Sequence, residues 1–239
     1  MSRGSYLIHQ KGFDSFSNSE YEEGGAEFKQ ALTANGWEVL HIPAHMIESE
    51  MPTTATGLAE FDCVVISDVG ANTFLLTPRV FKRSQAEANR LEAIKEYVLG
   101  GGALLMVGGY MSFSGIDAKA NYANTPLAAI MPVGIRMVDD RVEVPQGVTP
   151  EVVARHPALP DDRGWPALLG YNKTDVLDDG EVLVKVHGDP LVAIRKVGEG
   201  RTGVFTSDLA PHWAPPEFLT WSGYPEVWTR LILWLTSKE

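Results

Sequence analysis

The stretch Ala103-Leu104-Leu105-Met106-Val107-Gly108-Gly109 decides the fold class of this chain. Five apolar residues in a row, with no polar residue between them, are typical of a strand that is buried on both faces. The two glycines that follow end the strand abruptly. A second run of this kind, Cys63–Ser67, lies upstream. Because strands buried on both faces need helices above and below them, the chain is predicted to be an α/β protein.

The segments before and between these two runs alternate strand and helix patterns. In chain order, the patterns predict a strand over Tyr6–His9, a polar loop over Gln10–Tyr21, a helix over Ala26–Ala34, a strand over Glu38–Ile42 and a helix over Arg90–Leu99. Asn35-Gly36 and Gly100-Gly101-Gly102 are the stops of the two helices. This alternation predicts a mainly parallel sheet that helices cover on both faces.

The chain becomes rich in strand patterns from about Val133 to Lys196. Apolar residues alternate on both sides of Asp139-Asp140, which predicts an antiparallel hairpin there. Further strands are predicted over Glu181–Val186, Leu191–Lys196 and Thr202–Thr206, with a turn at Gly198-Glu199-Gly200 and a last helix from Pro225 to about Thr236. We therefore expect one domain over residues 1–239, with a β-rich extension.

Composition excludes several classes of function. The net charge of -11 and the pI near 5.0 disfavour nucleic acid and anionic membranes as partners. The first ten residues lack a signal-peptide pattern, and no apolar run approaches the ~20 residues that cross a bilayer. A single cysteine, Cys63, allows no internal disulfide. We expect a cytoplasmic protein that binds a small molecule, and an assembly into homo-oligomers is left open.

Polar residues follow each predicted strand, and in open parallel sheets ligands bind beyond these strand ends. We therefore expect a pocket on this rim. The candidate residues are His9 and Lys11 after the first strand, Ser67, Asp68 and Asn72 after the third, Gly109, Tyr110, Ser112 and Ser114 after the fourth, and Ser207, Asp208 and His212 after the last. Trp213, next to His212, is a candidate for a pocket lid, although the C-terminal aromatic residues are better explained as packing of the last helix.

No cofactor or metal is predicted. Gly100-Gly101-Gly102 precedes a strand and so does not form a dinucleotide-binding turn. The spacing of His9, Asp68, Asp208 and His212 matches no standard metal motif. Cys63 opens a buried strand and is interpreted as an inert core thiol.

Several blocks of the chain resemble the glutamine amidotransferase-like family, a domain of unknown function in the class I glutamine amidotransferase superfamily. They extend from the first strand to the last helix and include Lys11–Phe16, Ser67–Thr73, Leu104–Gly115, Asn124–Leu127, Met131–Val133, Phe205–Asp208 and Ala210–Trp213. Trehalose-utilisation-like proteins resemble the chain more distantly. The resemblance implies a flavodoxin-like, three-layer α/β/α fold.

The same resemblance argues against glutaminase activity. Members of the superfamily that hydrolyse glutamine carry a cysteine in a Gly-x-Cys-x-Gly elbow, and here Gly108–Ser112 puts Tyr110 in the cysteine position. Their histidine is replaced as well, because Thr206-Ser207-Asp208 stands where His-Pro-Glu is expected. Thiol attack on an amide needs both groups. The backbone N–H groups of the elbow are still expected to be able to hold a polar or anionic ligand.

Two hypotheses follow for the function. In the first, the chain is an enzyme for a sugar-like or carbonyl substrate, in which Asp208 or Asp68 is the general base or acid and Tyr110 donates a hydroxyl proton. In the second, it is a non-catalytic binding or interaction module. The environment of the two carboxylates separates these hypotheses, because only a base needs a perturbed pKa.

Overall fold

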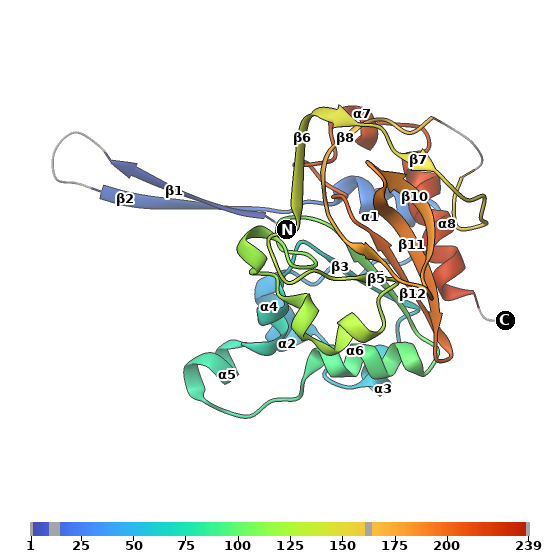
Figure 1. The fold of residues 1–239 in the computed structure, drawn as a ribbon. Helices are drawn as coiled ribbons and strands as arrows, with labels where there is room; N and C mark the ends of the chain where they lie inside the picture. Colours follow the sequence, from blue (N-terminus) through green and yellow to red (C-terminus); the bar gives the residue numbers. More distant parts are fainter. Residues whose placement is uncertain (1, 10–14, 161–163, 238–239) are drawn as a thin grey trace.

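A computed structural model describes residues 2–9, 15–160 and 164–237, and of residues 2–9 and 15–22 it describes the backbone only. Its central feature is a six-stranded mixed sheet (Figure 1). In spatial order, the strands are β3 (Cys63–Ser67), β4 (Ala103–Val107), β12 (Gly200–Phe205), β11 (Asp189–Val197), β10 (Glu181–Val186) and β7 (Glu151–Val152).

The predicted mainly parallel sheet is wrong. Strand β4 is parallel to β3 and to β12, but β11, β10 and β7 continue the sheet with antiparallel pairs. The reason is the short turn at Gly198-Glu199, which joins β11 directly to β12. A parallel pair needs a long crossover connection, and this turn leaves no room for one. The β-rich part of the chain thus supplies half of the main sheet.

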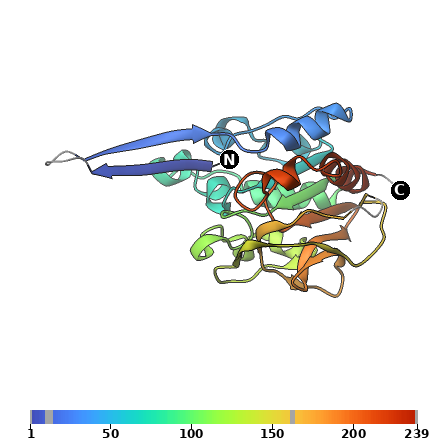
Figure 2. The ribbon, with the colours of Figure 1, turned by 90° about the horizontal axis from the view of Figure 1, so that it is seen from above.

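Alternating side chains of β4 divide the interior into two cores. Leu104 and Met106 pack into one cluster, whereas Leu105 and Val107 pack into the other. Helix α6 (Arg90–Leu99) covers the first face, and α1 (Ala26–Ala34) and α8 (Tyr224–Thr236) cover the second (Figure 2). The continuous apolar run of β4 is explained by this position between two helical layers.

Shorter elements complete the chain. The helical ones are η1 (Ala44–Met46), α2 (Ile47–Glu50), α3 (Ala55–Leu58), α4 (Ala71–Leu75), α5 (Pro78–Arg83), η2 (Ile116–Ala118), η3 (Tyr122–Asn124), η4 (Pro126–Ala129) and α7 (Pro216–Leu219). Two small antiparallel sheets pair β6 (Arg141–Val148) with β8 (Leu168–Asn172), and β5 (Val133–Gly134) with β9 (Asp175–Val176). The predicted hairpin around Asp139-Asp140 is therefore wrong, because Ile135–Met137 forms no strand and the other arm, in β6, pairs with β8 further along the chain.

The N-terminal region also differs from the prediction. Strand β1 (Ser2–His9) pairs with β2 (Ser15–Glu22) in an antiparallel arm that stands off the body (Figures 1 and 2). The segment Gln10–Tyr21 was predicted to be a loop; its residues 10–14 lie outside the described residues, and the rest forms most of β2. Polar side chains do not prevent such pairing, because the ladder uses backbone groups. No strand is assigned over Glu38–Ile42, contrary to the prediction.

No helix in the described ranges is both long and apolar enough to cross a membrane.

Candidate functional site

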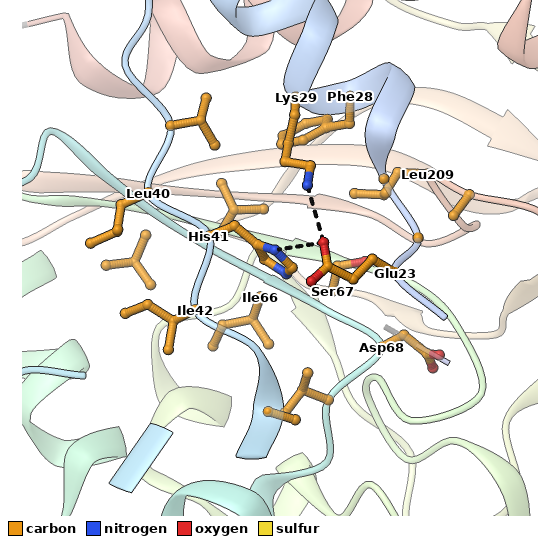
Figure 3. A pocket seen from close by; sticks show the side chains of 18 of the residues that line it. Glu23, Phe28, Lys29, Leu40, His41, Ile42, Ile66, Ser67, Asp68 and Leu209 are labelled. Carbon is orange, nitrogen blue, oxygen red and sulfur yellow. Dashed lines mark ion pairs between the residues drawn. The ribbon is translucent and has the colours of Figure 1, made fainter. Parts of the chain in front are cut away.

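Loops from three parallel neighbours meet at one rim of the sheet. Asp68 follows β3, Tyr110 belongs to the loop after β4, and Asp208 follows β12. A cavity of about 500 Å³ opens here and continues along β3 (Figure 3). Its rim end is lined by Asp68, Asp208 and His212, and its remainder is largely apolar. The rim is therefore hollow at Asp68, Asp208 and His212, which come from two separate segments, whereas the expected residues Tyr110 and Ser112 are not part of the cavity lining.

Asp68 connects the end of β3 to the elbow that follows β4. Its Oδ1 accepts a hydrogen bond from the backbone N–H of Met111 at 2.7 Å. Its own N–H donates to Ser112 Oγ at 3.0 Å, and that hydroxyl donates to the carbonyl of Val107 at 2.6 Å. Asp68 has a φ of 47°, in the left-handed region that aspartate tolerates better than most residues. The turn directs its carboxyl group back toward the elbow.

The environment of Asp68 is typical of an acid or base. Burial raises the pKa of its carboxyl group above the ordinary value of 3.8, and the charge of Asp208 raises it further. The Met111 N–H opposes this shift because it stabilises the carboxylate. A carboxyl group with a raised pKa that lines a cavity is a candidate for proton transfer.

Asp208 holds two neighbouring groups. Its Oδ1 accepts from the N–H of Ala210 at 3.0 Å, which closes a tight turn. Its Oδ2 lies 3.5 Å from Nδ1 of His212, and this pairing raises the pKa of the imidazole above its ordinary 6.5. Asp208 is nearly buried, whereas the side chain of His212 is 42% exposed. Asp208 thus both caps a turn and orients a histidine that solvent can reach.

Tyr110 lies beside this histidine. Its ring stacks on His212 with centroids 5.2 Å apart, and the guanidinium carbon of Arg141 lies 4.9 Å from the same ring centroid. Burial, and after it the Glu143 carboxylate, raises the pKa of the Tyr110 phenol. The phenol therefore keeps its proton at neutral pH and can act as a donor.

The chain itself occupies several amide groups of the elbow. Besides the Met111 N–H, which Asp68 takes, the Gly109 N–H donates to Asn172 Oδ1 at 3.0 Å. The N–H groups of Ser114 and Gly115 donate to the Asp140 carboxylate at 2.8 and 2.9 Å. None of these four amides is free for a ligand, so the expectation of an anion-binding elbow is wrong for Gly109 and Met111, the two that lie within Gly108–Ser112. The packing is equally tight, since a Cβ on Gly109 would come within 2.8 Å of Asp68 Oδ1.

The remaining predicted residues are spread over different environments. Ser112 and Ser114 are buried, and their hydroxyls donate to backbone carbonyls, those of Val107 and Arg136. Ser207 is buried too, and its hydroxyl donates to the Gly170 carbonyl. Asn72 is exposed on α4 and is not among the residues that line the cavity.

Trp213, His9 and Lys11 complete the set of predicted residues. Trp213 is 1% exposed and donates from Nε1 to Glu143 at 3.0 Å, so it is fixed in the interior and is not a lid, and it is not among the residues that line the cavity. Lys11 lies outside the described residues. For His9 only the backbone, at the end of β1, is described.

Sequence reasoning missed the groups that support the loop after β4 from β8, from the start of β6 and from Asp140 just before it. Asn172 donates a hydrogen bond from Nδ2 to Asp140 Oδ1 at 2.8 Å, which connects these two supporting side chains. Arg141, which lies over Tyr110, forms a two-point contact with Asp139 at 3.0 and 2.8 Å. Adjacent aspartates followed by an arginine were visible in the sequence, but that pattern is also common in turns.

A second polar group lies at the mouth of the cavity. The Glu23 carboxylate is 3.5 Å from Lys29 Nζ and 3.6 Å from His41 Nδ1 (Figure 3). Burial lowers the pKa of His41. Across the described ranges, no group of three or more histidine, cysteine or acidic side chains is placed to hold a metal ion.

Comparisons with known proteins agree with this architecture. Residues 2–237 match a protein family described as "Putative glutamine amidotransferase". Two cytoplasmic proteins of Salmonella typhimurium share the structure. One is 40% identical with a TM-score of 0.94, over 98% of this chain and 95% of its own. The other, from strain LT2, is 42% identical with a TM-score of 0.92, and the match covers 98% of this chain and 97% of that protein.

A more distant likeness concerns the fold alone. A ThuA-like protein of Bacteroides uniformis is 14% identical, with a TM-score of 0.55 over 89% of this chain and 82% of its own. Among curated proteins no match was found.

Proposed function

Because the chain belongs to the glutamine amidotransferase-like family, we propose that it binds or acts on a small polar metabolite at the strand carboxyl ends, without glutaminase chemistry. The observation that carries this proposal is the Asp68 carboxyl group. It lines the cavity, has a raised pKa, and shares the rim with His212, which Asp208 orients. A proton acceptor and a proton donor thus face one cavity, as general acid–base chemistry requires.

Amide hydrolysis through a thiol does not fit this site. The only cysteine, Cys63, lies in β3, and burial raises the pKa of its thiol to about 12. A thiol with that pKa carries almost no thiolate at neutral pH. Thr206, at the position of the expected histidine, is buried and donates its hydroxyl proton to the Pro190 carbonyl at 2.8 Å. Neither the cysteine nor the histidine of a glutaminase is therefore found at its expected position, where Tyr110 and Thr206 stand.

The charge of the rim indicates a class of ligand. Asp68 and Asp208 bring two carboxylates to it, whereas His212 brings one titrating positive charge. Carboxylates repel anions and accept hydrogen bonds from hydroxyl groups. The rim therefore favours a neutral, polyhydroxylated or carbonyl compound over a phosphate or a carboxylic acid. Asp68 is then the base, His212 the acid that Asp208 positions, and Tyr110 a hydroxyl donor.

The second candidate function is a binding module without catalysis. The observation in its favour is that both carboxylates also hold loops: Asp68 accepts from Met111, and Asp208 accepts from Ala210. Under either function we propose a cytoplasmic location, in keeping with the description of the two Salmonella proteins. No nucleic-acid or membrane partner is proposed, and a homo-oligomer is compatible with both functions.

The proposal is tested with a set of small compounds and two matched variants. Glucose, myo-inositol, glyceraldehyde, gluconate and glutamine are screened for binding by ligand-observed NMR, and bound compounds are then followed for conversion. Asp68→Asn is compared with Asp178→Asn, an exposed aspartate that is not part of the cavity lining. We expect a neutral compound to bind and Asp68→Asn to weaken it at least tenfold, roughly the loss of one hydrogen bond to a charged group. Asp178→Asn should bind like the wild type.

The outcomes separate the two candidates. Conversion that stops in Asp68→Asn supports the enzyme, whereas binding with no conversion of any bound compound supports the module. Glutamine should release ammonia only at the level of a blank. The rim assignment fails if the bound compound is held equally well by Asp68→Asn and the wild type, or if none of the compounds binds.

A further inference from the structure

His212 has a backbone conformation that few residues other than glycine adopt. Its φ is 154°, in a region where a side chain crowds the backbone. The side chain is 42% exposed, so burial in the core does not offset the strain. Strain of this kind persists only where the surrounding structure fixes it, and it is concentrated at functional sites. Neighbouring groups must therefore hold His212 in place.

The chain is anchored on both sides of His212. Before it, the backbone N–H of Ala210 donates to Asp208 Oδ1. After it, Trp213 is buried, and its carbonyl accepts a hydrogen bond from the Leu169 N–H at 2.8 Å. The backbone of His212 thus connects two fixed points and has little freedom to relax. These anchors set the path of the chain, but they leave the imidazole free to turn about its side-chain bonds.

Asp208 and Tyr110 hold the imidazole itself. Asp208 Oδ2 lies 3.5 Å from Nδ1, so one ring nitrogen faces a carboxylate. The Tyr110 ring is nearly parallel to the imidazole, with an interplanar angle of 19° and centroids 5.2 Å apart. The first contact selects the nitrogen, and the second limits rotation of the ring. Nε2 is therefore the nitrogen that is left for proton transfer.

Tyr110 is held in turn by Arg141. The guanidinium carbon lies 4.9 Å from the Tyr110 ring centroid, where a cation is attracted to the π-electrons. Arg141 is fixed by its two-point contact with Asp139, which also accepts a hydrogen bond from the N–H of Asp117 at 2.9 Å. A continuous series of contacts thus leads from the residues around the start of β6 to the loop after β12. We call it the stacked series: Asp139, Arg141, Tyr110 and His212.

We propose that Arg141 is a positioning residue for His212 and that it acts through the ring of Tyr110. This inference rests on the proposed function only for the role of His212 as an acid at the rim. Proton transfer needs a donor at hydrogen-bond distance and in the right direction, whereas exposed side chains change rotamer within nanoseconds. The stacked series restricts the imidazole from outside the cavity. Tyr110 therefore contributes to the site although it does not line the cavity.

The ring of Tyr110 and its hydroxyl have separable parts in this arrangement. Tyr110→Phe removes the hydroxyl but keeps the stack on His212 and the ring face for Arg141, whereas Tyr110→Leu removes all three. Arg136 provides a matched control for Arg141. Its Nε and Nη2 contact Asp175 at 3.1 and 2.7 Å, and its side chain is 34% exposed, against 22% for Arg141. It is not part of the stacked series.

NMR of the isotope-labelled full-length protein tests the proposal. In the wild type we expect a backbone order parameter of about 0.85 at His212, and imidazole protons that the Tyr110 ring shifts upfield. Tyr110→Leu should lower the order parameter below about 0.6 and abolish the upfield shift, and Arg141→Gln should reduce both. Tyr110→Phe and Arg136→Gln should leave both unchanged. Arg141→Gln should add nothing in the Tyr110→Leu background, because the two residues act in series.

Further variants cover the case in which Arg141→Gln does not fold. Arg141→Lys keeps the charge but loses the planar two-point contact, so it should give values between those of Arg141→Gln and the wild type. The proposal is overturned if the Arg141 and Tyr110→Leu variants leave His212 unchanged, or if Arg136→Gln loosens it equally. A full effect of Arg141→Gln in the Tyr110→Leu background overturns it as well. None of these outcomes decides whether a compound binds at the rim, which Asp68→Asn tests separately.

The strain at His212 has a test of its own. His212→Gly should melt roughly 2–4 °C above His212→Ala, because glycine adopts this φ without crowding. At ordinary positions the order is reversed, since glycine loses more conformational freedom on folding. Thermal melts of the two variants measure the difference. A higher melting temperature for His212→Ala would mean that the conformation is not strained and needs no support from the stacked series, against the proposal.

Discussion

Asp68 and Asp140 both accept hydrogen bonds from backbone amides of the loop after β4, and the protein uses them differently. Burial raises the pKa of both carboxyl groups. Asp140 is 2% exposed and accepts three hydrogen bonds of 2.8–2.9 Å, from Ser114 N, Gly115 N and Asn172 Nδ2. Asp68 accepts one, from Met111, and lines the cavity. The saturation of hydrogen bonds therefore distinguishes a structural carboxylate from one that a ligand can reach.

The largest expected effect is on stability at Asp140. Asp140→Ala leaves three buried donors without an acceptor, and we expect a loss of about 3–5 kcal/mol of unfolding free energy. Asp68→Ala should cost about 1 kcal/mol, since it removes one acceptor and relieves a buried charge. Urea unfolding at pH 7 measures both. Equal losses would mean that the hydrogen-bond difference does not separate the two carboxylates.

The pH dependence of stability gives a second comparison. The folded state holds the Asp68 proton to a higher pH than the unfolded state does, because its folded pKa is raised. The free energy of unfolding that protonated Asp68 contributes is therefore present below the unfolded pKa of about 3.9. It is lost as pH rises from there through the folded pKa. Asp68→Asn lacks this group, so its stability relative to the wild type should increase from pH 4 to pH 8. Thermal melts across that range measure the difference, and a constant difference would show that the pKa of Asp68 is not raised.

The smallest effect is expected at the Asp208–His212 pair, where the histidine is partly exposed. Asp208→Asn should leave the melting temperature almost unchanged, since asparagine caps turns about as well as aspartate. It should lower the pKa of His212, which an NMR titration of the imidazole protons reports. It should also weaken ligand binding or turnover at the rim. An Asp208→Asn variant that functions like the wild type would mean that Asp208 only caps the turn at Ala210.

Local signals in the sequence were sufficient for many elements. Helices over Ala26–Ala34 and Arg90–Leu99 and strands over Cys63–Ser67, Ala103–Val107 and Glu181–Val186 have the predicted bounds. Each has an apolar period and a clear stop, such as Asn35-Gly36 after the first helix. These signals depend on neighbouring residues, and a single chain segment contains them.

The same local signals could not give the partners of each strand. Val142 and Val144 alternate as a strand should, yet β6 pairs with β8 and not with the nearest upstream segment. Asp139-Asp140 reads as a turn, but Asp140 is a buried acceptor for amides 25 and 26 residues upstream and for Asn172. Pairing between distant segments depends on packing of the whole chain, which no local window contains.

The sequence by itself determined the α/β class, the positions of Asp68, Tyr110 and Asp208 after the ends of parallel strands, and the absence of a cysteine from the elbow. These follow from apolar periods, from the rule that parallel strands end at one rim, and from residue identity. Only the tertiary structure decided that the sheet is mixed, that Trp213 is buried and bonded to Glu143, and that Asp68 and Asn172 occupy the elbow amides. Those outcomes depend on which donor lies within hydrogen-bond distance of which acceptor, and folding brings such groups together from far apart in the chain.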